Sequence, residues 1–319
     1  MSDTNFPDNN AGSAAGGTMV TRNEYPTTVG GMIEWCAQEL ERGDVFCGHG
    51  TDNVIDEAAS LVCAVAGLEH AAAISGPQAF YTRALPGGVA VAINGMLRQR
   101  IEQRLPLPYL LKEAWFAGLP FYVDERVLVP RSPFAELIAA HFEPWLEPSS
   151  VRRILDIGTG SGCIAIALAR AFPASHVVAV DLMPDALDVA RINVTRHAVQ
   201  DRVELVQSDL FEQVEGTFDL IVSNPPYVAE GEVTELPPEY SHEPNVGLFS
   251  GADGLDSSRR ILQDAARYLT DDGMLAIEVG DGAARLDAAF SKLGFIWLEF
   301  ESGGEGVALL SAAELRAGL

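Results

Sequence analysis

The chain contains 319 residues, of which 48% are hydrophobic and 21% are charged, and its formal net charge is -24 at pH 7. This composition is typical of a globular protein and excludes a collagen-like or wholly disordered chain. The surplus of acid disfavours broad contact with nucleic acid, because binding to phosphates requires a basic surface. The same charge either attracts a basic partner or only maintains solubility, and both interpretations remain open.

The sequence shows no sign of a membrane span or a signal peptide. No apolar run is long enough to cross a bilayer, and the first residues lack a basic segment followed by an apolar one. We therefore expect a cytoplasmic protein that contacts no membrane. The four cysteines form no CxxC pair and no cluster with histidine at metal-ligand spacing. We expect reduced thiols, no disulfide framework and no bound metal.

Residues 1–25 are rich in Asn, Gly, Ser, Ala and Thr and contain few large apolar side chains. Such a segment cannot bury enough surface to become ordered, so a disordered tail is predicted. Residues 26–112 carry apolar side chains at helical spacing, which predicts a small helical domain. Thr51 or Asp52 is expected to cap its second helix, and another helix is expected over residues 89–104.

A linker of strand-forming residues follows at residues 113–132. Its aromatic and β-branched residues are interrupted by turn-forming residues at 118–120, which predicts a β-hairpin. A helix is expected to begin at Pro133 and to lead into a second domain, residues 133–319.

Strand-like and helix-like runs alternate in this second domain. Seven strands are expected, at residues 153–157, 177–181, 203–207, 220–223, 274–279, 295–300 and 306–310. Helices are expected between several of them, for example at residues 163–171 and 185–197. Repeated βα units predict an α/β fold with a mostly parallel sheet that helices cover on both faces.

A glycine-rich turn joins the first of these strands to a helix. Gly158, Gly160 and Gly162 let the backbone turn tightly and approach a ligand closely, with the amides of the helix facing it. Asp156 precedes the turn, where its carboxylate could hold a cationic amino group. An NAD site is a rival interpretation, but it requires a Gly-x-Gly-x-x-Gly spacing that this turn lacks. A loop that binds nothing is the plainer alternative.

Two further acids follow at the ends of the second and third strands. Asp181 could accept hydrogen bonds from both hydroxyls of a ribose. Asp209 could accept one from an adenine amino group, with Leu210 or Phe211 against the ring. Taken singly, Asp181 could instead cap a helix and Asp209 could be a turn residue. Three acids at the ligand-binding edge of an open α/β sheet together favour one nucleoside site.

The fourth strand ends in the sequence Ser-Asn-Pro-Pro-Tyr, residues 223–227. This segment resembles the Asn-Pro-Pro-Tyr motif of amino-methyltransferases, which act on planar amide or exocyclic amine nitrogens. The alternative is a proline-rich loop that ends a buried strand. Its position beyond a complete cofactor site, at the same edge of the sheet, favours methyl transfer.

The chemistry of an amide nitrogen explains these residue types. Its lone pair is delocalised into the carbonyl, so the nitrogen attacks a methyl donor poorly. The side-chain oxygen of Asn224 and the carbonyl oxygen of Pro225 can each accept one N–H of the target, which fixes the NH2 plane and stabilises developing positive charge. Pro225 and Pro226 hold this wall rigid, and Tyr227 can pack on the planar group. Asn224, Pro225 and Tyr227 are the candidate catalytic residues, and Pro226 joins them in substrate binding.

Residues 48–310 resemble the glutamine methyltransferases of translation proteins. The resemblance implies a helical N-terminal domain that recognises the substrate, a hairpin linker and a class I methyltransferase domain with a Rossmann-like, seven-stranded sheet. It also implies S-adenosylmethionine as the methyl donor. The residues expected to bind this cofactor are Asp156, Gly158, Thr159, Gly160, Gly162, Asp181, Asp209, Leu210 and Asn224.

Two bacterial branches of this family act on different proteins. One methylates the Gly-Gly-Gln glutamine of peptide-chain release factors, and the other methylates a glutamine of large-subunit ribosomal protein three. Residues 127–138 resemble the ribosomal-protein branch, because they lack the acidic or polar pair and the Thr-Glu that usually follow Pro-Arg-Pro in the other branch. Residues 47–53, 115–118 and 208–211 favour the same branch. Ribosomal protein three is the expected partner, and release factors are the alternative.

Several residues that match this family admit two interpretations. Arg131 could meet the substrate at the mouth of the pocket or could only pair with a carboxylate. The loop at residues 242–255 could form the rim of the pocket, although packing that closes the loop is favoured. His49 and Asp52 could form an acid/base pair, but a capped helix start is favoured.

Two other classes of function were weighed against protein methylation. A DNA adenine methyltransferase would share residues 224–227, but it must extract its base from the duplex and needs a basic cleft. The acidic composition and the small helical domain argue against it, so no specific DNA binding is expected. A non-catalytic translation adaptor could retain the fold without the chemistry, and the intact Asn224, Pro225 and Tyr227 argue against that.

Overall fold

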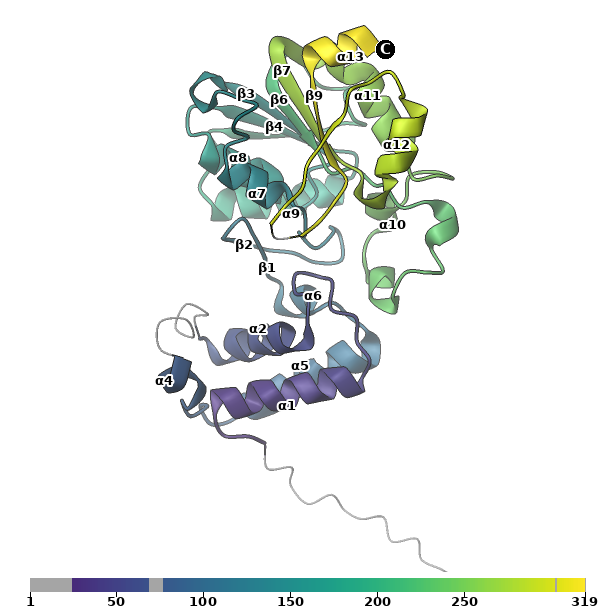
Figure 1. Cartoon of the computed structure of the whole chain (residues 1–319). Coiled ribbons are helices and arrows are strands. Elements are labelled where there is room, and N and C mark those ends of the chain that lie inside the picture. The colour runs from purple at the N-terminus through teal and green to yellow at the C-terminus, as the bar shows by residue number, and fades with distance from the viewer. Residues whose placement is uncertain (1–24, 69–76, 302, 319) are drawn as a thin grey trace, which may run out of the picture.

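The computed structural model describes residues 25–68, 77–301 and 303–318. A helical part and a larger α/β part are joined by a short hairpin (Figure 1). The predicted disordered tail lies outside the described residues except for Tyr25, whose ring packs edge-on against Trp35 with the centroids 5.5 Å apart. Within the described residues, no helix is both long enough and apolar enough to cross a membrane.

The helical part packs around a core of its own. Its helices are α1 (Val29–Arg42), α2 (Val54–Ala66), α4 (Pro77–Tyr81), α5 (Val89–Gln103) and α6 (Leu107–Leu111). Apolar side chains three or four residues apart line one face of α1 and meet those of α2 and α5, for example at Met32, Leu61 and Leu97. The sequence therefore specifies this bundle through the helical spacing of its apolar residues.

The second helix begins one residue later than predicted. Asn53 rather than Thr51 or Asp52 caps α2, because its side-chain oxygen accepts hydrogen bonds from the amides of Ile55 and Asp56 at 3.1 and 2.9 Å. Asn and Asp are both good caps, so the type of residue alone does not fix the position.

The predicted hairpin is present, but its turn lies earlier than expected. Strand β1 (Ala114–Phe116) pairs antiparallel with β2 (Leu119–Phe121). Ala117 and Gly118 form the two-residue turn with φ of 48° and 73°, a left-handed geometry that matches the twist of the strands. Pro120 was predicted to be a turn residue and instead lies in β2.

The α/β part has a seven-stranded sheet in the order β5-β4-β3-β6-β7-β9-β8. The strands are β3 (Arg153–Ile157), β4 (His176–Asp181), β5 (Val203–Gln207), β6 (Phe218–Ser223), β7 (Leu269–Glu278), β8 (Ile296–Trp297) and β9 (Val307–Ser311). The first five in chain order are parallel, and β9 runs antiparallel to both β7 and β8. This confirms the predicted Rossmann-like sheet of a class I methyltransferase.

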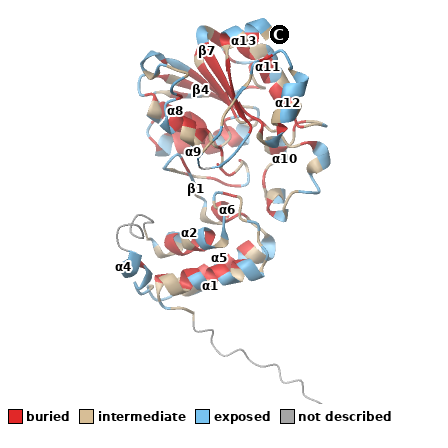
Figure 2. Ribbon diagram, viewed as in Figure 1, coloured by how far each residue is buried: buried red, intermediate tan, exposed pale blue. Residues whose placement is uncertain are grey.

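Helices cover both faces of this sheet, and the buried residues are concentrated between the layers (Figure 2). One face carries α7 (Phe134–Ala139), α8 (Cys163–Ala171) and α9 (Pro184–Arg196), and the other carries α11 (Asp256–Tyr268), α12 (Ala283–Ala289) and α13 (Ala312–Gly318). Because both faces are buried, the central strands are nearly continuous runs of Val, Ile, Leu and Ala.

The order of the strands places a crevice at their carboxyl ends. Strand β3 is central, and its neighbours β4 and β6 lie on opposite sides of it, so the loops after them diverge. This is the topological switch point at which open α/β sheets bind ligands. A long segment between β6 and α11, which includes α10 (Asn245–Leu248), projects from this edge toward the helical part (Figure 1).

Candidate active site

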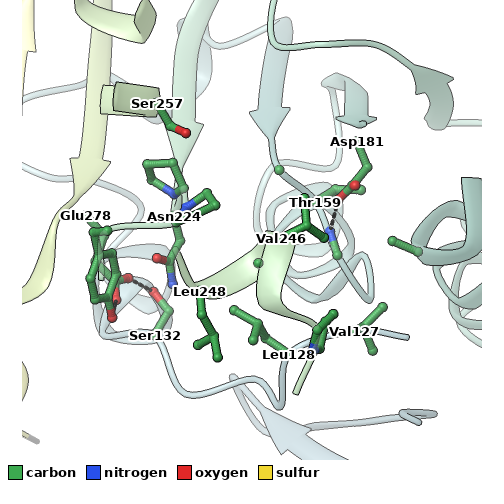
Figure 3. A pocket seen from close by; sticks show the side chains of 18 of the residues that line it. Val127, Leu128, Ser132, Thr159, Asp181, Asn224, Val246, Leu248, Ser257 and Glu278 are labelled. Atoms are coloured by element: carbon green, nitrogen blue, oxygen red, sulfur yellow. Dashed lines mark hydrogen bonds between the residues drawn. The ribbon is translucent and has the colours of Figure 1, made fainter. Parts of the chain in front are cut away.

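A cavity of about 710 Å³ lies at the carboxyl edge of the sheet. Its wall is formed by the loops after five of the strands, β3 to β7, together with residues 126–133 that follow the hairpin. Figure 3 shows Thr159 and Asp181 at one end and Asn224, Ser132 and Glu278 at the other. We call these the cofactor side and the chemical side of the cavity.

The glycine-rich turn after β3 opens the cofactor side. Gly158 and Gly160 have positive φ of 73° and 53°, and both line the cavity. A Cβ at Gly160 would meet no described heavy atom within 4 Å, so the backbone here borders open space. The amides of Gly158 and Thr159 each donate to the Val180 carbonyl at 2.9 Å, which fixes the turn against β4. Gly162 instead allows close packing of the turn against α9, because a Cβ there would lie 3.2 Å from the Cβ of Ala190.

Asp156 lies beneath this turn rather than on the cavity wall. It is fully buried, and its Oδ2 accepts hydrogen bonds from the Thr159 hydroxyl at 2.6 Å and the Ala165 amide at 3.2 Å. Its Oδ1 has no hydrogen-bond partner among the described residues. Burial raises the pKa of Asp156 to about 7. The carboxyl thus ties the turn to the start of α8 and keeps one oxygen for a further donor.

Asp181 ends β4 and faces the cavity. Its two oxygens accept hydrogen bonds from the amides of Gly160 at 2.8 Å and Met183 at 2.9 Å. A carboxylate has about four acceptor positions, so these two bonds hold its orientation and leave capacity for a ligand. Burial raises its pKa, and the backbone hydrogen bonds oppose that rise. The acid does not cap α9 through its side chain, because Met183 occupies that N-cap position.

Asp209 and Leu210 follow β5 and complete the cofactor side. Both line the cavity. Arg260 of α11 donates to Asp209 Oδ1 at 2.9 Å, in a pair that is partly exposed. Leu210 has a positive φ of 50°, which turns the chain sharply at this point. Phe211 lies farther inside, stacked on Tyr268 with centroids 4.5 Å apart.

The residues of the Asn-Pro-Pro-Tyr segment all line the chemical side. Pro225 is buried, and Asn224 and Tyr227 are half-buried. The loop is held closely: a Cβ at Gly254 would lie 2.2 Å from the Tyr227 carbonyl oxygen, and a Cβ at Gly280 would lie 2.8 Å from the Tyr227 ring. Both glycines are required by packing, and Gly254 supports the interpretation that residues 242–255 close the loop. Residues 244 and 246–249 of the same loop also line the cavity, so the loop borders the pocket as well.

Sequence reasoning missed Glu278, which ends β7 at the same edge. Its carboxyl accepts hydrogen bonds from the Ser132 hydroxyl at 2.5 Å and the Tyr227 hydroxyl at 3.4 Å. Asn224 lies at the same end of the cavity (Figure 3), and its side chain favours the ionised form of the carboxyl. Burial raises the pKa of Glu278 to about 7. The signal available was its place at the end of a predicted strand on the ligand-binding edge.

Arg131 pairs with a carboxylate, and the partner is Glu243. The pair is bidentate, with both hydrogen bonds at 2.6 Å, and Glu243 has no exposed side-chain surface. Burial would raise the pKa of Glu243, but the hydrogen bonds from Arg131 and the proximity of His49 outweigh it and lower that pKa to about 2. Arg131 also lies over the Tyr240 ring at 5.2 Å. It lines the cavity, so contact with a substrate is compatible with this pairing.

His49 and Asp52 do not form an acid/base pair in the structure. His49 is buried, with Nε2 3.5 Å from Glu243 and its ring 4.8 Å from that of Tyr240. Asp52 is exposed near the start of α2. His49 therefore contributes to the contact between the helical part and the loop after β6.

A second buried charge cluster joins the same two regions, and we call it the Arg100 cluster. Arg100 of α5 is 1% exposed and pairs with Glu57 of α2 at 2.5 Å and with Glu239 at 3.0 Å. Glu239 also accepts from the Phe46 amide at 3.0 Å. Because Glu239 belongs to the segment after β6, this cluster anchors the loop of the chemical side to the helical part.

The two sides of the cavity present different chemical groups. Backbone amides, two carboxylates and an apolar surface line the cofactor side, whereas acceptor oxygens and a buried carboxyl line the chemical side. Across the described ranges, no group of three or more His, Cys, Asp or Glu side chains could hold a metal ion.

Comparison with known proteins identifies relatives over most of the chain. Residues 135–236 match the family model "Methyltransferase small domain". A ribosomal protein uL3 glutamine methyltransferase from Francisella tularensis is 42% identical over 90% of this chain and 91% of its own length. A protein of the same name from Neisseria meningitidis serogroup B is 41% identical over 90% of this chain and 94% of its own length.

Solved structures show the same fold at lower identity. The crystal structure of the hMettl16 catalytic domain in complex with MAT2A 3'UTR hairpin 6 matches with a TM-score of 0.50 and 17% identity. The match covers 70% of this chain and 81% of that one. At this identity the likeness supports the methyltransferase fold alone.

Proposed function

Because the chain belongs to the family of ribosomal protein uL3 glutamine methyltransferases, we propose that it transfers a methyl group from S-adenosylmethionine to a glutamine side chain of ribosomal protein uL3. One observation carries the chemistry: the Asn-Pro-Pro-Tyr residues and the glycine-rich turn with Asp181 line the same cavity. Ribosomal protein uL3 is the large-subunit protein three expected from residues 127–138. The reaction is expected to take place in the cytoplasm.

The cofactor side fits this donor. The open space before Gly160 admits the close approach of a ligand, and Asp181 keeps acceptor positions for ribose hydroxyls. Asp209, whose Oδ1 accepts from Arg260, is proposed to accept a hydrogen bond from the adenine amino group beside Leu210. Asp156 lies under the turn and is proposed to support it through the Thr159 hydroxyl and the Ala165 amide, which both donate to its Oδ2. When bound, S-adenosylmethionine supplies an electrophilic methyl group on its sulfonium.

The chemical side is proposed to hold the glutamine amide. The Asn224 side-chain oxygen and the Pro225 carbonyl oxygen accept the two N–H groups, so the nitrogen lone pair faces the cofactor side. These oxygens also stabilise the positive charge that develops on the nitrogen, which then loses a proton to water. Pro226 stiffens this wall and Tyr227 packs on the planar group.

The helical part is proposed to recognise the protein substrate. The Arg100 cluster and the contacts of His49 hold it against the segment after β6, so its surface lies next to the loop that borders the cavity. The formal charge of -24 favours the approach of a basic protein such as a ribosomal protein. Residues 26–112 are the proposed recognition domain.

A transfer assay with a labelled methyl donor tests the proposed function. Purified enzyme is incubated separately with ribosomal protein uL3, a release factor, ribosomal RNA and duplex DNA, and the label in each macromolecule is counted. We expect label on uL3. Label that enters the release factor in preference to uL3 would move the enzyme to the other branch, and label on nucleic acid would refute protein methylation.

A further inference from the structure

The mechanism above does not use the buried carboxyl of Glu278. This residue is 5% exposed, ends β7 and lines the cavity. It accepts hydrogen bonds from the hydroxyls of Ser132 and Tyr227, and the Asn224 side chain favours its ionised form. Figure 3 shows Ser132, Asn224 and Glu278 gathered at one end of the cavity. A buried carboxyl beside the proposed amide-binding asparagine is a candidate to orient it.

We propose that Glu278 is a positioning residue whose ionised carboxylate accepts a hydrogen bond from the Asn224 NH2 group and so keeps the Asn224 oxygen facing the substrate. The inference rests on the proposed function and assigns what orients the residue that grips the amide. Glu278 itself is not proposed to touch the glutamine.

The two ends of an asparagine side chain explain why such a residue is needed. The carboxamide has an oxygen that accepts and an NH2 group that donates, and the two have nearly the same size. Shape alone therefore does not select the orientation. If Asn224 turned around, its NH2 group would face the NH2 group of the substrate, donor against donor. An ionised carboxylate only accepts, so it selects the orientation in which the Asn224 NH2 group faces Glu278.

The other neighbours of Glu278 are also arranged for an ionised carboxylate. Ser132 Oγ already accepts from the Phe134 amide at 3.1 Å, so its own hydrogen is free to donate to Glu278. Tyr227 donates to the other oxygen of the carboxyl. Hydrogen bonds to a charged acceptor are about twice as strong as those between neutral groups. Loss of the charge would therefore weaken the hold on Asn224 without removing it.

The charge of Glu278 changes within the working range of pH. Burial raises its pKa to about 7, although Ser132, Tyr227, the charge of Arg131 and Asn224 oppose the rise. Tyr227 and Arg131 also face Glu278 but do not change charge in this range. Burial raises the pKa of the Tyr227 phenol, which stays neutral. Glu243 raises the pKa of Arg131 despite the burial of Arg131, which stays charged. Glu278 is ionised above about pH 7, so activity should rise with pH through that value.

The raised pKa of Glu278 makes the stability of the fold fall as pH rises, which is opposite to its expected effect on activity. A carboxyl whose pKa is raised on folding stabilises the fold at low pH, and that contribution is lost as pH rises from its ordinary value of 4.5 to about 7. Above about pH 7, Glu278 therefore supports the reaction most and stabilises the fold least. This opposition distinguishes a functional carboxylate from one retained for packing.

The test is the pH dependence of single-turnover methyl transfer to uL3 in the wild type and in Glu278→Gln. Glutamine keeps the shape but resembles the protonated acid. We expect a rate about tenfold below wild type at about pH 8, a flat profile between about pH 6 and 8, and a donor Kd within about twofold of wild type. We also expect the unfolding temperature of the variant, relative to wild type, to be higher at about pH 8 than at about pH 5.

Two further variants keep the inference falsifiable. Ser132→Ala leaves the carboxyl in place but removes a donor that lowers its pKa, so the rise in activity should move to higher pH. Asp156→Asn removes the other buried carboxyl whose pKa is about 7, and the rise in activity should persist in it at whatever rate remains. If Glu278→Gln does not fold, the Ser132→Ala profile decides.

A wild-type rate in Glu278→Gln, or an unmoved profile in Ser132→Ala, would overturn the inference. If the rise in activity with pH disappears only in Asp156→Asn, the titrating carboxyl is Asp156 on the cofactor side and not Glu278. Failure of the proposed function looks different, because the wild-type enzyme would then leave uL3 unlabelled at every pH.

Discussion

The two sides of the cavity are built in different ways. On the cofactor side, contacts span shorter stretches of chain and acceptor capacity remains: Asp181 reaches Gly160 across 21 residues and Met183 across 2, and Asp209 reaches Arg260 across 51. On the chemical side, Ser132 meets Glu278 across 146 residues, and the carboxyls there are surrounded by donors. A surface that must bind a mobile ligand keeps hydrogen-bonding positions open, whereas a surface that must hold a planar amide is fixed by contacts from the whole chain.

The largest expected effect concerns the Arg100 cluster, which anchors the chemical side. Arg100→Leu leaves Glu57 buried without its cation and leaves Glu239 only the partly exposed Arg104 at 3.5 Å. Removal of one partner from a buried ion pair costs about 3–5 kcal/mol. Denaturant unfolding measures this loss.

The matched control is Arg98→Leu on the same helix. Arg98 pairs with Glu102 at 2.9 Å but is 66% exposed, so the loss should be below about 0.5 kcal/mol. Equal losses in the two variants would show that the buried cluster contributes no more than a surface pair.

Asn224→Ala separates the two sides by function. We expect single-turnover transfer to fall about a hundredfold, in line with removal of a positioned polar group, while the donor Kd stays near the wild-type value. Calorimetry and rapid quench measure the two quantities. A lost donor affinity with an unchanged rate would move Asn224 to the cofactor side.

Asp181→Ala makes the opposite change. The donor should bind more weakly by about 1–3 kcal/mol, because charge-assisted hydrogen bonds to the ribose are lost. The rate at saturating donor should recover most of its wild-type value. Unchanged affinity in calorimetry would remove Asp181 from the cofactor site.

The smallest effect is expected from Arg260→Ala. Arg260 holds Asp209 in a partly exposed pair, and such pairs contribute about 0–1 kcal/mol. The donor Kd should therefore change by less than about fivefold in the same calorimetric assay. A change as large as that of Asp181→Ala would mean that Arg260 contacts the donor directly.

The fold was predictable because its signals are local. Alternating strand and helix patterns gave the strands of the sheet to within a few residues, and β3, β5 and α8 have the predicted bounds. The errors lie where several residues suit one role. Asn53 rather than Thr51 or Asp52 caps α2, and the hairpin turns at Ala117, a residue type that seldom adopts a positive φ.

The two sides of the cavity also differ in how far the sequence reveals them. The cofactor residues stand beside recognisable turns and strand ends, and their roles stay predictions. The contacts of Glu278 with Ser132 and of Glu243 with Arg131 could not be predicted from the sequence, since each joins residues more than a hundred positions apart. A single sequence holds no periodic pattern that pairs such residues.

The most direct test of the account asks which atom receives the methyl group. Ribosomal protein uL3 is methylated with an isotopically labelled donor, digested, and analysed by tandem mass spectrometry. The account predicts label on the side-chain nitrogen of a glutamine, and a strong reduction of that label with Asn224→Ala. Label on a lysine, an arginine or a main-chain nitrogen would contradict the proposed grip of Asn224 and Pro225 on a planar carboxamide.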